Sequence, residues 1–286
     1  MTPSFEPTPD RTRAGRCAAL LLTLLLSMGQ GTVSDPLELA RQRYNEQQYE
    51  EAIGLAEGAR QVPALAHPAA IIFARAHLER FRLLGDRDHL RAAREALKTV
   101  EVSALNSRDR VELLVALGQT LYLDDESTLD DRFSAAAEQF EVALAHADVL
   151  DVRGRDLLFD WWAGALDRQA LQGPESARGA IYARILAGAE AELARGPDVV
   201  SASYWLAAAA RGTDDTARAV GAAAAGWVRA ASLGERGLTL RADLDRLMRQ
   251  VILPDRAREL ATGADPRPTL ILLEGQWTQF KEKWAR

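Results

Sequence analysis

Histidines and carboxylates are the side chains of this sequence that could support acid–base or metal chemistry. His77 and Glu79 lie two residues apart in an expected helix, so their side chains point away from each other. A Gly-x-Ser-x-Gly elbow, a phosphate-binding loop and a dinucleotide fingerprint are all absent from the sequence. The histidines are scattered, and none has the His-Glu-x-x-His spacing of a helical metal site: His67, His77, His89 and His146. We therefore expect a protein that is not an enzyme and that has neither a metal site nor a cofactor.

An acidic stretch at residues 124–131 resembles a calcium-binding loop in charge alone. It lacks the alternating Asp ligands, the central Gly and the terminal Glu of such a loop. Asp130 and Asp131 stand directly before an expected helix that begins near Arg132, where carboxylates can cap the helix and complement its dipole. We interpret the stretch as a solvated connector.

All six tryptophans lie in the C-terminal half of the chain. Trp161 adjoins Trp162, and Tyr204 adjoins Trp205. Neighbouring residues of a helix point about 100 degrees apart, so these four rings cannot all be buried in one seam. Two interpretations remain open. The rings are core packing, or one member of each pair faces an aromatic-lined apolar pocket.

The elements that would position these side chains are almost all helices. Alanine is abundant, Leu, Arg and Glu are common, and strictly alternating β-branched runs are nearly absent, which predicts an all-α protein. The apolar spacing predicts antiparallel helix pairs at 37–47 with 49–61, at 69–84 with 89–100, and at 108–123 with 132–147.

The same rhythm continues in the C-terminal half. Asp198 can cap a helix at 199–211, and a helix of small residues follows at 217–231. A further apolar stripe is expected to end at Pro254. Apolar residues at helical spacing over 273–284 predict a C-terminal closing helix, with a short strand at 269–273 as the alternative.

Two segments carry small and aromatic residues at the spacing of helix-pair repeats. These residues are Tyr44, Tyr49, Ala52, Ile53 and Ala59 in one segment, and Gly118, Leu121, Tyr122, Ala136, Phe140 and Ala143 in the other. This pattern resembles the tetratricopeptide repeat family. The resemblance implies an α-solenoid of stacked antiparallel helix pairs over 35–150. Divergent helical repeats would continue the array over 155–286. Two departures, the extra residues 124–128 and the missing proline after each pair, favour divergent repeats over regular ones.

The resemblance also implies a concave groove lined by the first helix of each pair. The matching positions are Arg41, Tyr44, Asn45, Arg75, Arg82, Gln119 and Tyr122. Guanidinium groups bind carboxylates bidentately, so such a groove could hold a carboxylate or an extended peptide. The alternative is that these arginines belong to solvated helix faces.

The N-terminus resembles a secretory signal peptide, which we place at residues 1–29. Arg11, Arg13 and Arg16 precede an apolar segment at 18–28, which is too short to span a bilayer. We therefore expect a periplasmic or secreted protein with no membrane span in its mature chain. The net charge of −6 and the absence of a Lys/Arg cluster argue against nucleic acid as a partner.

Two functions follow as expectations. The first is an exported, non-catalytic scaffold whose groove binds a peptide or protein partner in an envelope assembly. The second is a small-molecule-binding accessory component of a periplasmic transport system. The segment around Tyr204 and Trp205 is similar to part of the T-component of TRAP transporters, which implies this second function.

Overall fold

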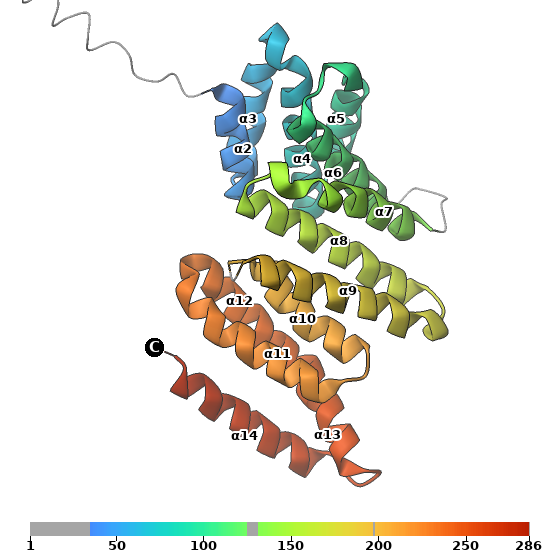
Figure 1. Cartoon of the computed structure of the whole chain (residues 1–286), viewed down its shortest axis with the longest axis vertical. Helices are drawn as coiled ribbons and strands as arrows, with labels where there is room; N and C mark the ends of the chain where they lie inside the picture. Colours follow the sequence, from blue (N-terminus) through green and yellow to red (C-terminus); the bar gives the residue numbers. More distant parts are fainter. Residues whose placement is uncertain (1–34, 125–130, 197, 286) are drawn as a thin grey trace, which may run out of the picture.

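The computed structural model describes residues 35–124, 131–196 and 198–285, and over these ranges the chain is helical and contains no strand. The helices form an elongated stack that runs from α2 at one end to α14 at the other (Figure 1). The all-α prediction is confirmed. The expected signal peptide at 1–29 and most of the acidic connector lie outside the described residues.

The bounds of the helices agree closely with the expected helix pairs. The N-terminal helices are α2 (Pro36–Asn45), α3 (Tyr49–Arg60), α4 (Ala66–Leu84), α5 (Arg87–Lys98), α6 (Ser107–Leu123), α7 (Arg132–Ala145) and α8 (Val152–Gln172). The C-terminal helices are α9 (Glu175–Arg195), α10 (Val200–Gly212), α11 (Thr216–Arg229), α12 (Gly234–Leu247), α13 (Leu253–Ala261) and α14 (Arg267–Lys283). Short 3-10 turns join several of them.

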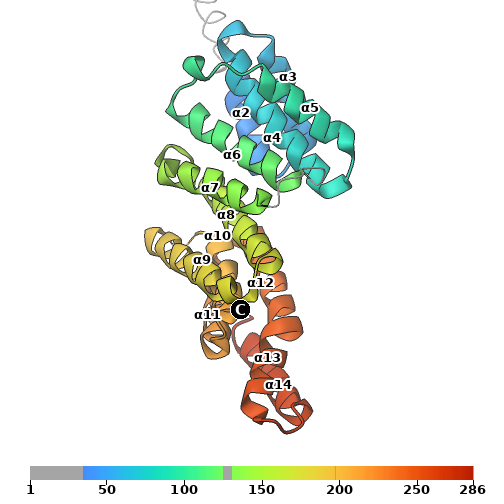
Figure 2. The ribbon, with the colours of Figure 1, turned by 90° about the vertical axis from the view of Figure 1, so that its right-hand side faces the viewer.

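Most neighbours in sequence are neighbours in space, although α6 packs against α4 more than against α5. The most extensive packing joins α2 with α3, α3 with α4, α4 with α5, α6 with α7, α7 with α8, α9 with α10, and α10 with α11. Figure 2 shows the same succession from the side. This arrangement is consistent with a stacked helical repeat. None of the described helices is both long and apolar enough to cross a membrane.

Small residues lie where successive helices meet. Ala52, Ala59, Ala136 and Ala143 are fully buried, at the positions where the sequence pattern places small side chains against a crossing helix. One large core then continues from α6 to α14, and smaller clusters fill the space between α2 and α6.

The expected closing helix is present as α14, and it includes residues 269–273, for which a strand was the alternative. Two other local expectations are wrong. The stripe of α12 does not end at Pro254, because a π-helical turn, η5 (Met248–Ile252), carries the chain into α13, where the proline occupies the first turn and needs no N–H partner. Asp131 precedes α7 as expected, but its side chain makes no capping hydrogen bond.

Candidate partner-binding site

The predicted groove residues are brought together by the fold, but most of them lie inside the molecule. The inner faces of α2, α4, α6 and α8 meet at the carboxylate of Glu79, which is 2% exposed. Its Oε1 accepts from Tyr44 Oη at 3.2 Å, from Gln119 Nε2 at 3.1 Å and from Trp161 Nε1 at 3.0 Å. Its Oε2 accepts from Arg82 Nε at 2.9 Å. We call these five side chains the Glu79 cluster.

Tyr44 shows how dry the Glu79 cluster is. Its side chain is 1% exposed, and burial, together with the negative charge of Glu79, raises the pKa of its hydroxyl to about 12, although the positive charge of Arg75 acts in the opposite direction. The guanidinium of Arg75 lies 4.3 Å from the centre of the Tyr44 ring, and Arg75 itself is 4% exposed. Tyr44 and Arg75 therefore pack against each other and present no free surface to a partner.

Arg41 forms ion pairs with two buried acidic residues of α6. Its Nη2 lies 2.5 Å from Asp109 Oδ1, and its Nε donates to both oxygens of Glu112 at 3.0 Å. Burial alone would lower the pKa of Arg41, but the charge and hydrogen bonds of Glu112, with Glu38 and Asp109, hold it above its ordinary value. Arg41 and Arg75 are thus buried and paired inside the molecule, and the groove that the sequence resemblance implies stays a prediction.

The other predicted groove positions lie nearer to the surface. The Arg82 side chain is 47% exposed, and its guanidinium lies 5.6 Å from the Trp161 ring centre. Tyr122 is partly buried and packs edge-on against Trp161 at 5.1 Å. Asn45, at the end of α2, is partly exposed and donates to Asp151 Oδ2 at 2.9 Å.

The two aromatic pairs have different surroundings. Trp161 and Trp162 are both buried, which favours the core-packing interpretation for this pair. Trp161 packs with Tyr122, whereas Trp162 packs with Phe159 at 5.5 Å. Tyr204 and Trp205 remain partly exposed. Of the four, Tyr204 lines a cavity.

That cavity is a hollow of about 910 Å³, which we call the trough. Its lining comes from the turn that joins α2 to α3 and from α8, α10, α12 and η5. We call its apolar and aromatic lining residues the floor: Leu157, Val200, Tyr204, Leu240, Leu247 and Val251. We call its charged lining residues the rim: Glu46, Arg153, Asp156, Asp160, Glu235, Arg236, Asp243 and Arg246. π-Helical turns are frequent at functional sites, and η5 supplies both Gln250 and Val251 to this lining.

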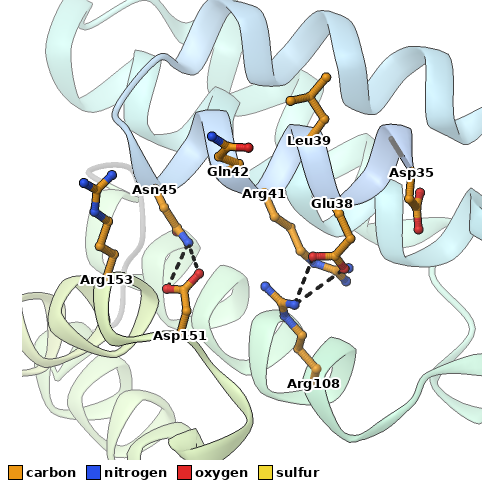
Figure 3. Close-up of a pocket in the computed structure, with 9 residues that line it drawn as sticks. All are labelled: Asp35, Glu38, Leu39, Arg41, Gln42, Asn45, Arg108, Asp151 and Arg153. Carbon is orange, nitrogen blue, oxygen red and sulfur yellow. Dashed lines mark hydrogen bonds and ion pairs between the residues drawn. The ribbon is translucent and has the colours of Figure 1, made fainter. Parts of the chain in front are cut away.

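A smaller pocket of about 480 Å³ adjoins the trough and shares Asn45 and Arg153 with it. Figure 3 shows it between α2, Arg108 of α6 and the start of α8. Glu38 accepts from Arg108 Nη1 at 3.1 Å across this pocket. Arg153 is exposed at the junction of the two hollows and has no ion pair with a described residue. The two pockets thus form one surface along the end of α2.

Asp156 ties three helices together at the wall of the trough. This residue of α8 is 7% exposed and accepts from the backbone N–H groups of Ser201 at 3.0 Å and Val200 at 3.3 Å. It also forms an ion pair with Arg236 of α12. The first N–H groups of α10 are therefore capped from a neighbouring helix, and not by Asp198 as the sequence suggested.

The sequence contained a signal for this wall that was overlooked. Asp156 and Asp160 are four residues apart on α8, so they share a face that the stripe of Trp161 and Trp162 does not occupy. A pair of acids on the second face of a helix with a strong apolar stripe marks a surface that can line a cleft.

No protein-family model, curated protein or solved structure matches this chain. A proposal for its function therefore depends on the helical stack and on the trough. The structure is consistent with a stacked helical repeat, and membership of the tetratricopeptide repeat family remains a prediction.

Proposed function

We propose that this protein is a non-catalytic binding scaffold, and that a segment of a partner protein lies in the trough. The observation that carries the proposal is the trough itself, an apolar floor with a charged rim, built by α8, α10 and α12. Protein segments dock into such hollows by placing apolar side chains on the floor, while charged groups at the rim select the sequence.

The chemistry of the lining supports binding over catalysis. The described lining contains neither histidine nor cysteine, and the hydroxyl of Ser201 donates to the carboxylate of Asp156. Neither a histidine nor a lysine of the described chain lines the trough to activate this hydroxyl, and the carboxylate of Asp156 is already engaged by Arg236 and by two backbone N–H groups. Among the described residues, no three His, Cys, Asp or Glu side chains are grouped closely enough to hold a metal ion.

The proposed setting is an envelope or secretion assembly outside the cytoplasm. Its support is the sequence of residues 1–29, which resembles a secretory signal. The partner would be a peptide or protein, because the chain carries a net negative charge and the rim has more acids than arginines.

The test is selection from a random library of 12-residue peptides displayed on phage, with the folded chain immobilised. Arg41 and Arg75 are unsuitable for mutation, since replacing them with acids would break buried ion pairs and packing instead of reporting on binding. Gln250→Trp, an exposed position in the lining, would fill part of the trough. Gln276→Trp, on the exposed face of α14, is the matched control.

We expect selected peptides to bind the parent chain and the Gln276→Trp variant equally, and the Gln250→Trp variant at least about tenfold more weakly. Circular dichroism would show that both variants remain helical. If the selected peptides bind both variants alike, or if no peptide is enriched, the trough is not a peptide-binding surface.

A second candidate is favoured by the position of Tyr204 within the trough, with Trp205 packed edge-on against it at 5.4 Å. We propose as the alternative a small-molecule-binding accessory component of a transport system, since hollows of roughly 300 to 1,000 Å³ suit such ligands. Quenching of tryptophan fluorescence by one class of metabolite would support it. A flat response across a metabolite panel would exclude it.

A further inference from the structure

We propose that the Tyr204 end of the trough is a subsite for a cationic side chain, an arginine or lysine, of the bound partner segment. This inference rests on the scaffold function proposed above and names the chemistry of its partner. The occupant would be a basic amphipathic segment, with one cation at Tyr204 and apolar side chains on the floor beside it.

Three helices contribute to this subsite. Asp160 comes from α8, Tyr204 from α10 and Asp243 from α12, and all three line the trough. Trp205 Nε1 donates to Asp160 Oδ1 at 2.8 Å, which fixes the orientation of that carboxylate. Asp160 is nevertheless exposed, and its Oδ2 has no hydrogen-bond partner among the described residues. One oriented oxygen is therefore available to an incoming donor.

The electrostatic environment of Tyr204 is negative. Burial raises the pKa of its hydroxyl, and the charges of Asp167, Asp243 and Asp160 raise it further, while Arg246 acts in the opposite direction. A phenol surrounded in this way lies where a cation is favoured. The partly exposed ring adds to this, because the face of an aromatic ring attracts a guanidinium or ammonium group.

The arginines of the rim do not neutralise these acids. Arg236 is paired with the buried Asp156. Arg246 lies 3.4 Å from Asp243, and both side chains of this pair are exposed, so solvent screens it. Arg82, whose charge also acts on Asp160, donates to Glu79. Asp160 and Glu235 have no ion pair with a described residue.

The apolar residues of the floor determine which side chains should stand beside the basic residue in the bound segment. Val200 lies one turn before Tyr204 on α10, Leu157 comes from α8, and Leu247 and Val251 come from α12 and η5. A free ammonium ion or a small polyamine would leave this apolar surface uncovered. A segment with a basic residue next to aliphatic residues would cover it, and the charge of the segment would complement that of the rim.

The experiment uses the peptides selected from the random library, measured by fluorescence anisotropy. The variants are Asp160→Asn and Asp243→Asn, which keep the shape of the side chains and remove their charge. The control is Glu95→Gln, an exposed acid of α5 outside the trough. A parallel peptide carries citrulline, the neutral isostere of arginine, at the enriched basic position.

We expect enrichment of Arg or Lys beside aliphatic residues. The parent peptide should bind each Asn variant about 10-fold to 100-fold more weakly than it binds the parent chain, and the citrulline peptide should bind the parent chain more weakly by a similar factor. Binding of the citrulline peptide to an Asn variant should be little weaker still, because both changes remove the same contact. Glu95→Gln should bind as the parent does.

Two outcomes separate this inference from the proposed function. Peptides blocked by Gln250→Trp but lacking basic residues, or bound equally by the Asn variants, would overturn the cationic subsite and leave the scaffold function standing. Peptides that bind the Gln250→Trp variant as tightly as the parent chain would overturn both the cationic subsite and the proposed scaffold function.

Discussion

Burying a carboxylate costs several kcal/mol unless hydrogen-bond donors replace the water that it loses. Glu79 meets this condition with four donors from four side chains, of which Arg82 supplies the compensating charge. Arg41 is the reverse case, a buried cation whose charge is compensated by the carboxylates of Asp109 and Glu112. These residues therefore hold α2, α4, α6 and α8 in one arrangement, and the binding chemistry is left to the exposed charges of the trough.

Glu79→Ala should lower the free energy of unfolding by about 3 to 5 kcal/mol, because it leaves Tyr44, Gln119 and Trp161 without an acceptor and Arg82 without its partner. Glu95→Ala, at an exposed position of α5, should change it by about 0.5 kcal/mol or less. Urea denaturation followed by circular dichroism measures both. Equal stabilities of the two variants would show that the Glu79 cluster contributes no stability.

The pair formed by His77 of α4 and His89 of α5 should make stability depend on pH. Their Nδ1 atoms are 2.8 Å apart, and burial, followed by the charge of His89, lowers the pKa of His77 to about 4. The unfolded chain, with an ordinary histidine pKa near 6.5, then binds more protons than the native state between pH 6.5 and 4. Stability should therefore be complete above pH 6.5 and fall as the pH decreases towards 4.

The loss attributable to His77 should be about 1 to 2 kcal/mol, after allowance for the partial exposure of the ring. The measurement compares urea denaturation at pH 7 and pH 4.5 for the parent chain and for His77→Gln, which should lose that part of the pH dependence. His146→Gln, at an exposed position, is the control and should retain it. The same pH dependence in both variants would contradict the assignment to His77.

At the scale of helices, close approach depends on glycine facing an aromatic ring. A Cβ atom placed on Gly118 would lie 2.6 Å from the Phe140 ring, and one on Gly188 would lie 2.6 Å from the Trp162 ring. The third case is Gly212 of α10, where the distance to the ring of Tyr182 on α9 would be 2.2 Å. In three helix pairs, therefore, an aromatic ring of one helix packs against a glycine of its neighbour, where any larger side chain would clash with the ring.

Gly212→Ala should destabilise the protein by about 1 to 3 kcal/mol, because the ring of Tyr182 is packed and hydrogen-bonded to Asp167 and cannot move away freely. Gly221→Ala, on the exposed face of α11 with nothing within 4 Å of the added Cβ, should stabilise by up to about 1 kcal/mol through helix propensity. Thermal unfolding of the two variants tests this contrast. A shift in the same direction for both would mean that propensity outweighs the contact at Gly212.

At the scale of the whole molecule, the sequence predicted the helices well but not which of their polar residues would be buried. Helical periodicity is local, so the bounds of α3 and α6 agree with the expected ranges to within one residue. The angle at which each pair stacks on the next is not local. It brings the inner faces of α2, α4 and α6 together, and so buries Arg41 and Gln119, which as polar residues on amphipathic helices look solvent-facing in sequence. The trough follows from the same long-range geometry, since Asp156 reaches α10 and α12 across more than 40 residues.

The two ends of the stack should therefore differ in their importance for stability. Helix α2 is tied to distant parts of the chain through Tyr44 and through Asn45, which donates to Asp151. Helix α14 packs mainly on α13, and Trp277 is its one buried residue within the described range. Ile271 and Leu272 of α14 are 70% and 60% exposed and so contribute little burial.

Relative to a chain of residues 35–286, removal of residues 263–286 should lower the melting temperature by about 3 to 10 °C and leave the remaining helices folded, because it removes the burial of Trp277 and the bonds of Trp277 and Lys281 to the partly exposed Asp245. Removal of residues 35–47 should lower it about twice as far, since it also strips Asp109, Glu112 and Glu79 of partners inside the molecule. Circular dichroism during heating gives both values. A larger loss from the α14 end would mean that this stack is stabilised by nearest neighbours alone, as an ideal solenoid is, and that the contact of α2 with α8 adds nothing.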